Sequence, residues 1–246
     1  MNDSGHMARF WDERARENAL FYVDNRLDYK TGSYASDDPD DFWTKGRRDF
    51  DAILEAVGAP EIGPDDALLD IGCGVGRMTR AAAAKARQVT GIDVSAEMVE
   101  LARHELRDLQ NVELLVGDGT GLTGVADASV DVVFSVVVFQ HIPDPEITLG
   151  YVREIGRVLR PGGWAAFQVS DDPAVHEMDL PRAGGLRGAV ARLRGTEPRG
   201  QDDPAWRGSA VDLARLAAVA QESGTAVANV VGRGTQFCYV LLRREA

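Results

Sequence analysis

Apolar and polar positions alternate along the chain in blocks that predict strands separated by helices. Some short runs are almost wholly apolar, which is typical of strands buried on both faces of a sheet. These runs span residues 66–71, 88–93, 112–116 and 130–137. Stretches with helical spacing of apolar residues follow them, at about 77–86, 95–109 and 144–159. Strands that alternate with helices favour an α/β fold with a mostly parallel sheet and helices on both faces.

The C-terminal part of the chain continues this pattern and then changes it. A further strand is expected at 165–169, and a helix at 211–220 precedes two last strands at 225–231 and 235–243. Only Gly232-Arg233-Gly234 separates these last two strands. Because so short a connection cannot cross over a sheet, the pair must be antiparallel.

Three segments lie outside the predicted sheet. Residues 8–60 carry aromatic residues at helical spacing and are expected to form an N-terminal helical cap over the main domain, 61–246. Residues 1–7 include Ser-Gly-His-Met, which resembles the remnant of an expression tag, so we leave them out of the functional reasoning as a tag or disordered segment. Residues 171–208 are rich in Gly, Pro, Arg and Asp, with a short helical piece at 186–194, and are expected to be a lid or insertion.

A glycine-rich turn joins the first strand to the first helix of the main domain. Residues 68–76 read LLDIGCGVG, with Gly at positions 72, 74 and 76. Glycine removes Cβ atoms where a ligand must approach the backbone, and it permits positive φ in the turn. A dinucleotide-binding turn would place its third Gly at position 77, which is Arg77 here. The spacing therefore opposes a nicotinamide dinucleotide.

The Gly-x-Gly-x-Gly turn after Asp70 resembles motif I of the class I S-adenosylmethionine (SAM) methyltransferases. Four further motifs follow in that family's order, and together they cover roughly residues 45–172. They are a strand ending at Asp93, the sequence Gly117-Asp118-Gly119, the apolar strand at 129–136, and the turn at 158–164. The chain resembles the small-molecule type of this family. The resemblance implies a doubly wound, Rossmann-like α/β sheet of seven strands, mostly parallel with a reversed C-terminal strand.

The same resemblance implies SAM as cofactor, S-adenosylhomocysteine (SAH) as product, and a set of binding residues. Asp93 would accept hydrogen bonds from the ribose, Asp118 would read the adenine amino group, and Asp70 would order the turn beside the methionine portion. Met98 either packs against the adenine or is a core residue of its helix. The expected cofactor-binding residues are Asp70, Gly72, Cys73, Gly74, Gly76, Asp93, Val94, Met98, Gly117, Asp118, Gly119, Ser135, Tyr22, Trp43 and Gly46.

The last three of these residues, together with Phe42, come from the N-terminal segment. They are candidates to close over the methionine end of SAM, where an aromatic face would attract the sulfonium. Aromatic residues at helical spacing are, however, more often plain core residues.

The segment after the fourth predicted strand gives His141 a special place. In the family this segment passes beneath the transferred methyl group, at the edge where open sheets bind ligands. A neutral His141 could take the proton of the acceptor as general base. The alternative is a structural histidine that shapes the pocket. Gln140 beside it could fix the imidazole tautomer, and the sequence leaves both roles open.

Composition narrows the partners. The chain is 44% apolar, enough for one large core, and its net charge of −12 disfavours contact with nucleic-acid phosphates. No apolar run approaches the roughly 20 residues of a membrane helix. With two cysteines and no evident signal peptide, we expect reduced thiols, a cytoplasmic location, and Cys73 as a small turn residue rather than a nucleophile. We expect no nucleic acid and no membrane as partners, and homodimerisation is left open.

Missing motifs narrow the reaction. Residues 135–138 lack the Asn/Asp-Pro-Pro-aromatic pattern of amide and exocyclic-amine methyltransferases, and the carboxylates that would hold Mg²⁺ are absent, so no metal is expected. The sequence favours SAM-dependent transfer to an O or N nucleophile of a small molecule, for example a secondary metabolite. The alternatives are a catalytically idle SAM-binding or regulatory protein and an NAD-dependent oxidoreductase. The acceptor site is expected at 171–208, where Trp206 and His176 are the first residues to test, with the N-terminal helices.

Overall fold

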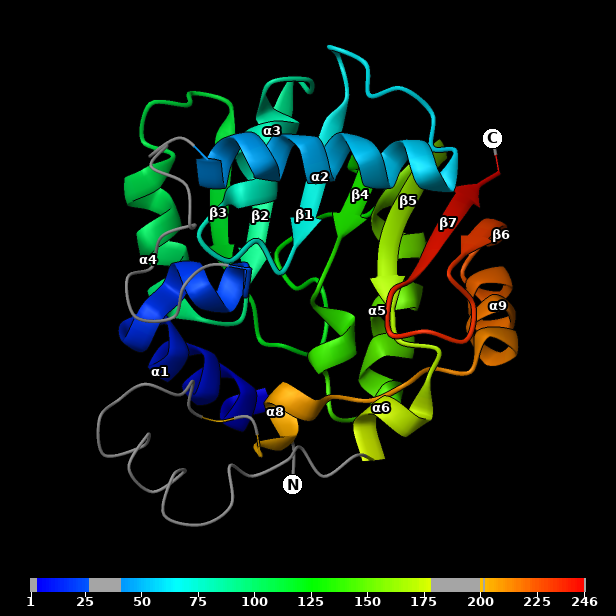
Figure 1. Cartoon of the computed structure of the whole chain (residues 1–246). Helices are drawn as coiled ribbons and strands as arrows, with labels where there is room; N and C mark the ends of the chain where they lie inside the picture. Colours follow the sequence, from blue (N-terminus) through cyan, green and yellow to red (C-terminus); the bar gives the residue numbers. More distant parts are fainter. Residues whose placement is uncertain (1–3, 27–40, 178–199, 201, 246) are drawn as a thin grey trace.

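The computed structural model of the chain contains a seven-stranded sheet with helices on both faces (Figure 1). The structure describes residues 4–26, 41–177, 200 and 202–245. The strands are β1 (Ala67–Ile71), β2 (Gln88–Asp93), β3 (Val112–Val116), β4 (Val130–Ser135), β5 (Leu159–Val169), β6 (Thr225–Val231) and β7 (Cys238–Arg244). Their order across the sheet is β3-β2-β1-β4-β5-β7-β6. The first strand thus lies in the middle of the sheet. Strands β2 and β3 follow on one side of it and β4 and β5 on the other, so the strand order reverses between β1 and β4, where open sheets bind ligands.

The direction of the strands confirms the predicted topology. Strands β1 to β5 pair in parallel, whereas β7 is antiparallel to both of its neighbours, β5 and β6. The short link after β6 leaves no room for a crossover, so β7 must return beside β6 in the opposite direction. It enters between β6 and β5, which makes the C-terminal strand the reversed one.

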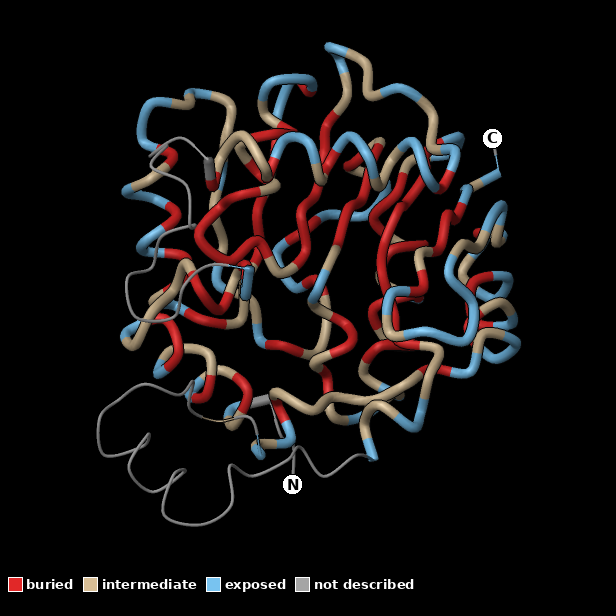
Figure 2. The backbone as a smooth tube through the Cα atoms, in the orientation of Figure 1, coloured by how far each residue is buried: buried red, intermediate tan, exposed pale blue. Residues whose placement is uncertain are grey.

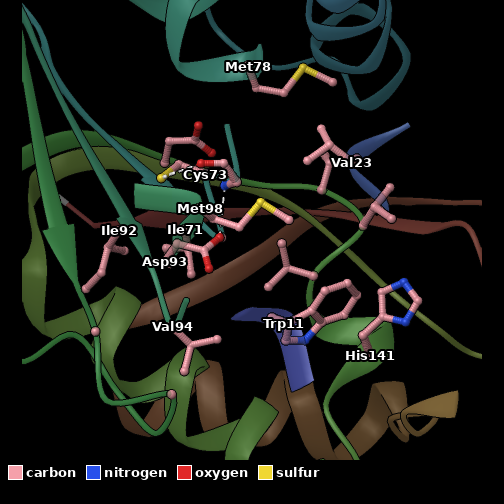
Figure 3. Close-up of a pocket in the computed structure, with 18 of the residues that line it drawn as sticks. Trp11, Val23, Ile71, Cys73, Met78, Ile92, Asp93, Val94, Met98 and His141 are labelled. Carbon is pink, nitrogen blue, oxygen red and sulfur yellow. Dashed lines mark hydrogen bonds between the residues drawn. The ribbon is translucent and has the colours of Figure 1, made fainter. Parts of the chain in front are cut away.

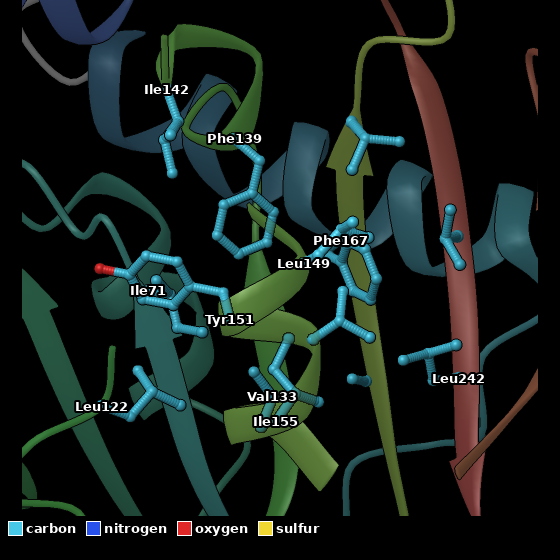
Figure 4. Close-up of a cluster of buried hydrophobic side chains, with 14 of the residues drawn as sticks. Ile71, Leu122, Val133, Phe139, Ile142, Leu149, Tyr151, Ile155, Phe167 and Leu242 are labelled. Carbon is cyan, nitrogen blue, oxygen red and sulfur yellow. The ribbon is translucent and has the colours of Figure 1, made fainter. Parts of the chain in front are cut away.

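Successive side chains of the central strands point to opposite faces of the sheet and pack into two separate hydrophobic cores. On one face Leu68 and Phe134 pack with Phe50 of α2 (Asp41–Val57) and with α3 (Arg77–Ala83). On the other face Val133 and Phe167 pack with α5 (Pro145–Val158) and α9 (Leu213–Glu222), as Figure 4 shows for the α5 side. Figure 2 shows that buried backbone runs through the central strands. Burial on both faces explains why these strands read as continuous apolar runs.

Capping residues mark the starts of several helices. Ser95 caps α4 (Ala96–Glu105), where its hydroxyl accepts from the Met98 N–H at 3.1 Å. Asp144 caps α5, with Pro145 at the first helical position, and Asp212 caps α9. Such caps satisfy backbone N–H groups that have no partner inside the helix.

Several small elements lie at the carboxyl ends of the parallel strands (Figure 1). They are α1 (Ser4–Val23), the 3₁₀ turn η1 (Phe139–His141), α6 (Pro173–Glu177) and α8 (Pro204–Arg207). α1 packs against α4, and α8 packs against η1 and α1. The site edge of the sheet is therefore covered by segments from both ends of the chain.

Several boundaries differ from the expectations. Residues 4–7 are the first turn of α1, and Met7 is 4% exposed in the core, whereas the sequence analysis left these residues out as a tag or disordered segment. β4 ends at Ser135 rather than at residue 137, because Val137 has a φ of 60° that no strand can accommodate. β5 begins directly at Leu159 after α5, earlier than expected.

The predicted helical piece at 186–194 lies outside the described residues, as does most of the expected lid. Among the helices that the structure does describe, none is long and apolar enough to cross a membrane.

Candidate functional site

A pocket opens at the carboxyl edge of the sheet, between β1, β2 and β4 on one side and α1 on the other (Figure 3). The sheet and its turns contribute Asp70, Gly72, Gly74, Asp93 and the segment 136–138. α1 contributes Met7, Trp11, Tyr22 and Val23 from the opposite side. Residues far apart in the sequence thus form one cavity at the position where this fold type binds ligands.

Backbone hydrogen bonds fix the glycine turn against the end of β2. The N–H groups of Gly72 and Cys73 both donate to the Ile92 carbonyl, at 2.7 and 3.1 Å. Gly72, Gly74 and Gly76 have φ values of 72°, 53° and 90°, which only glycine adopts freely. A Cβ on Gly72 would lie 2.2 Å from Val138, and one on Gly74 would lie 2.9 Å from Val23. The turn therefore requires glycine for both conformation and space.

Asp93 links the turn to α4 and faces the pocket. Its Oδ2 accepts from the Gly74 N–H at 2.9 Å, and its Oδ1 accepts from the Ser95 N–H at 2.9 Å. Burial raises the pKa of this carboxyl, although these two backbone donors oppose the shift. A carboxylate offers about four lone-pair sites, so each oxygen can accept one more hydrogen bond. That capacity fits a vicinal diol such as the ribose of SAM.

Asp70 at the end of β1 is the second pocket carboxylate. It is 3% exposed, and its Oδ2 accepts from the Thr79 hydroxyl at 2.6 Å. Burial raises the pKa of Asp70 to about 7, against the lowering effect of the Thr79 bond. A buried carboxylate is costly when no cation is near it. The site thus fits a ligand that brings a positive charge, as the ammonium and sulfonium groups of SAM do.

Arg77, the residue after the glycine turn, also lines the pocket, but its guanidinium forms ion pairs with carboxylates outside the pocket. Its Nη1 lies 2.8 Å from an Asp49 oxygen on α2 and 3.4 Å from an Asp24 oxygen just after α1. The guanidinium therefore ties three helical segments together beside the turn. At this position a dinucleotide-binding turn would have its third glycine.

Aromatic rings close the pocket from the α1 side. The Trp11 ring lies 5.4 Å from the His141 ring in an edge-on contact, and both rings contact Trp206 of α8. Tyr22 meets Trp206 at 5.7 Å, also edge-on. These contacts join α1, η1 and α8 into one wall that keeps water from the inner pocket.

His141 lines this wall as a neutral imidazole. Its Nδ1 lies 2.6 Å from the Trp206 carbonyl, so Nδ1 must carry a proton to donate. Its Nε2 lies 3.1 Å from the Gln140 side-chain nitrogen. Burial lowers the pKa of His141 to about 4. Both ring nitrogens are therefore engaged, and the imidazole is a weak base.

Most of the expected cofactor-binding residues meet at this pocket. Those that line it are Tyr22, Asp70, Gly72, Cys73, Gly74, Asp93, Val94, Met98, Gly117 and Gly119, together with His141. Burial raises the pKa of the Cys73 thiol well above its usual value, which keeps it un-ionised and agrees with a packing role.

Five expected residues are not among the described residues that line the pocket. Trp43 stacks on Arg80 at 4.9 Å, and Gly46 packs against the side chain of Arg77. Ser135 is fully buried, where its hydroxyl donates to the Ile71 carbonyl at 2.9 Å. Gly76 lies against Leu106 and caps α3. The fifth is Asp118.

The Asp118 carboxylate points into its own loop. Oδ1 accepts from the Thr120 and Gly121 N–H groups, at 2.8 and 3.2 Å, and Oδ2 accepts from the Thr123 hydroxyl at 3.1 Å. These bonds lower the pKa of Asp118. An acid at a strand end can serve its own turn as readily as a ligand, and the sequence pattern is the same for both.

The sequence reasoning missed several pocket residues. Met7 was set aside with the first seven residues, and Tyr151 of α5 was assigned only to the helix's apolar face. Val136, Val137 and Val138 belong to the segment that was expected to leave the sheet beside the ligand, but they were not named as binding residues. Nothing in the sequence separates an apolar pocket wall from an apolar core, because both use the same side chains.

Comparison with known proteins agrees with this fold. The model of a methyltransferase domain family matches residues 69–167, which span β1 to β5. This part of the chain therefore resembles a methyltransferase domain. A ubiquinone biosynthesis O-methyltransferase of Xanthomonas campestris is 35% identical over 111 residues, 45% of each chain. An uncharacterised 37.1 kDa protein in a transposon of Streptomyces fradiae is 37% identical over 124 residues, 49% of this chain and 34% of that one. The chain spans less than half the length of these curated relatives.

Solved structures share the fold of the methyltransferase domain. Phosphoethanolamine N-methyltransferase 1 of Haemonchus contortus, in complex with phosphoethanolamine and SAH, has a TM-score of 0.64 at 16% identity. The alignment covers 100% of this chain and 50% of that one. A putative sarcosine dimethylglycine methyltransferase from Galdieria sulphuraria has a TM-score of 0.58 at 15% identity, with coverages of 82% and 86%. SAM is the cofactor of this family, and the glycine turn with the buried Asp70 and the half-buried Asp93 fits it.

Proposed function

We propose that this chain transfers the methyl group of SAM to an O or N nucleophile of a small molecule. The observation that carries the proposal is the convergence of the glycine turn, Asp70 and Asp93 in one pocket beneath α1. Relatives with O-methyltransferase and N-methyltransferase names support the reaction class and leave the choice between O and N open.

The residues of this site would act mainly by binding and alignment. The turn at 72–74 and Asp93 would hold the nucleoside, and Asp70 would face the positive charge of the methionine portion. SAM supplies an activated methyl group, so the protein's task is to align the acceptor and exclude water. Trp11, Tyr22 and the apolar segment 136–138 would provide the dry wall that this requires.

We propose a pocket-shaping role for His141 rather than a general-base role. Its Nε2 is engaged by Gln140, and a conjugate acid with a pKa of about 4 belongs to a base too weak to take a proton efficiently near neutral pH. If His141 did affect the pH dependence of the rate, the change in rate would fall near pH 4 and not near the ordinary histidine pKa of about 6.5.

The acceptor would enter on the side of α1 and α8, where Trp206 stands against His141. His176 of α6 lies close to the same place, because its Nδ1 is 2.5 Å from the Arg207 carbonyl. The part of the proposed lid at 178–199 lies outside the described residues.

The decisive experiment combines calorimetry with a turnover screen. SAM and SAH should bind to the wild-type protein, and NADH should not. Incubation with SAM and a panel of hydroxylated and amino small molecules should release SAH. Binding of SAM without SAH release from any acceptor would support an idle SAM-binding protein instead, and absence of SAM binding would refute the proposal.

A further inference from the structure

Gln168 is a fully buried polar residue near the end of β5, one position before the strand ends. Its Oε1 accepts from the Val137 N–H at 2.7 Å. Its Nε2 donates to the Gln140 Oε1 at 2.6 Å and to the Gln236 carbonyl at 2.7 Å. If the Gln168 amide were rotated by 180°, its nitrogen would face the Val137 N–H donor and its oxygen would face the Gln140 and Gln236 oxygens. The orientation of this amide is therefore fixed by its partners.

The orientation of Gln140 follows from that of Gln168. Because the Gln140 Oε1 accepts from Gln168, its Nε2 must be the atom that faces the His141 Nε2 at 3.1 Å. An amide nitrogen can only donate, so the His141 Nε2 must be unprotonated. The ring proton then lies on Nδ1, which donates to the Trp206 carbonyl. One chain of hydrogen bonds thus runs from the Val137 N–H to α8 and sets the tautomer of the imidazole.

The residues at the two ends of this series of hydrogen bonds belong to the pocket. Val137 and His141 line it, and neither Gln140 nor Gln168 does. Val137 has a φ of 60°, a conformation that is rare for a β-branched residue and persists only where the surroundings impose it. The Gln168 Oε1 supplies the acceptor for its N–H. Gln236, on the link between β6 and β7, anchors the same carboxamide from the other side.

We propose that Gln168 is a positioning residue for methyl transfer, which holds His141 through Gln140 as a neutral, Nδ1-protonated imidazole and holds Val137 in its strained conformation on the pocket wall. The proposal rests on the proposed function of the same pocket. It concerns a residue that touches neither cofactor nor acceptor and acts through the two pocket residues. A charged imidazole in this wall would repel the sulfonium and disturb the acceptor's approach.

The Gln168→Glu variant separates this role from simple packing, because it keeps the shape of the side chain. A carboxyl group can still accept from Val137 but cannot donate to both carbonyl oxygens. The Gln140 amide would then turn its nitrogen to residue 168 and its oxygen to the His141 Nε2, which favours a proton on that nitrogen. Among the described residues, His176 is the titratable group whose charge lowers the pKa of His141, and the substitution leaves it in place.

The readout is nitrogen NMR of labelled histidine across pH, which reports tautomer and charge. The chain has four histidines, so single substitutions assign each signal. In the wild type, His141 should stay neutral with its proton on Nδ1 down to a pH near its pKa of about 4. In Gln168→Glu its protonation midpoint should rise by about one pH unit or more. The kcat should fall about tenfold while SAH affinity stays within about threefold.

Two further variants keep the proposal open to refutation. Gln221→Glu makes the same chemical change at an exposed position of α9 and should alter neither the titration nor kcat. Should Gln168→Glu fail to fold, Gln140→Met removes the donor to the His141 Nε2 and leaves Gln168 bound to Val137 and Gln236. That variant should also raise the midpoint of His141.

An unchanged His141 titration in Gln168→Glu, or in Gln140→Met where Gln168→Glu does not fold, would overturn the proposal. So would a parallel loss of SAH affinity and kcat, which would indicate general loosening. A wild-type protein that releases no SAH with any acceptor would refute the proposed function instead, and the NMR titration would still decide whether Gln168 controls His141.

Discussion

At the scale of single residues, the two pocket carboxylates, the buried Asp70 and the half-buried Asp93, have different tasks. Asp93 is held by two backbone N–H donors, whereas Asp70 meets a hydroxyl and has its pKa raised to about 7 by burial. Asp93 has oxygen lone pairs free to accept further hydrogen bonds. The charged form of Asp70 is disfavoured by burial, and a cationic ligand would stabilise it.

Asp93→Ala should weaken SAM binding by about 30- to 1,000-fold, or about 2–4 kcal/mol, because a charge-assisted pair of hydrogen bonds to the ribose is lost. Calorimetry on the folded variant measures the change. Asp118→Ala is the matched comparison, since its carboxylate serves its own loop; SAM affinity should change by less than about fivefold. Equal losses in the two variants would contradict the assignment of Asp93.

Asp70→Asn should remove a pH dependence of stability in the ligand-free protein. The pKa of Asp70 is about 7 in the folded state and near 3.8 in the unfolded state, so the folded state binds more protons in between. Stability from this group is fully present below pH 3.8, falls by about 1.4 kcal/mol per pH unit above it, and is lost at about pH 7. In urea unfolding, the free energy of unfolding of Asp70→Asn should rise relative to that of the wild type as the pH rises from about 4 to about 7. A constant difference across this window would refute the raised pKa.

His141→Asn tests the pocket-shaping role. The asparagine side-chain nitrogen can replace the Nδ1–H donor to the Trp206 carbonyl but cannot act as a base. Turnover at saturating acceptor should therefore fall by less than about tenfold, whereas loss of a general base would cost about 10²- to 10⁴-fold. The pH–rate profile of the wild type should show no limb near 6.5 that the variant lacks.

At the scale of elements, α1 is attached to the sheet domain through the start of α4. The Asp12 Oδ1 accepts from the Ser95 hydroxyl at 2.6 Å and from the Glu97 N–H at 3.2 Å. An acid at a helix N-terminus also interacts favourably with the helix dipole. This contact holds Trp11 of the same helix over the pocket.

Asp12→Ala should therefore loosen α1 and cost about 1–2 kcal/mol of stability. Hydrogen exchange should become faster in α1 than in the central strands. Glu13→Ala is the control, since the neighbouring Glu13 side chain is 64% exposed, and it should leave exchange nearly unchanged. Uniformly faster exchange in both variants would show that α1 is not held by this contact.

At the scale of the whole molecule, the pocket lies between two parts of the chain that are far apart in sequence. One wall is the sheet edge, and the other is α1 with α8 behind it. A ligand bound between them would stabilise the native state and restrain α1 at the same time.

SAH at about 100 times its dissociation constant should raise the free energy of unfolding by about 2.7 kcal/mol. Exchange of the α1 amides should slow in parallel, as measured by mass spectrometry. Asp93→Ala at the same SAH concentration should show little of either effect. Stabilisation without any protection of α1 would mean that the ligand contacts the sheet alone.

The sequence by itself determined the sheet and the cofactor turn, because both are local. Apolar runs, capping residues and the short link at 232–234 specify strands, helices and the reversed β7 without reference to distant residues. The glycines of the turn are equally legible, since positive φ and close packing require them there. The family resemblance added the roles proposed for Asp70 and Asp93.

Only the tertiary structure decided which side chains share the pocket and in what chemical state. Trp43 and Asp118 match the sequence pattern for binding residues but point elsewhere, whereas Met7 and Tyr151 line the cavity without any local signal. The hydrogen bonds through Gln168 and Gln140 join residues 28 positions apart, and the orientation of both amides depends on partners from the segment after β4, from η1 and from α8. Burial and hydrogen-bond partners set the protonation of His141, and neither can be read from the residue's neighbours in sequence.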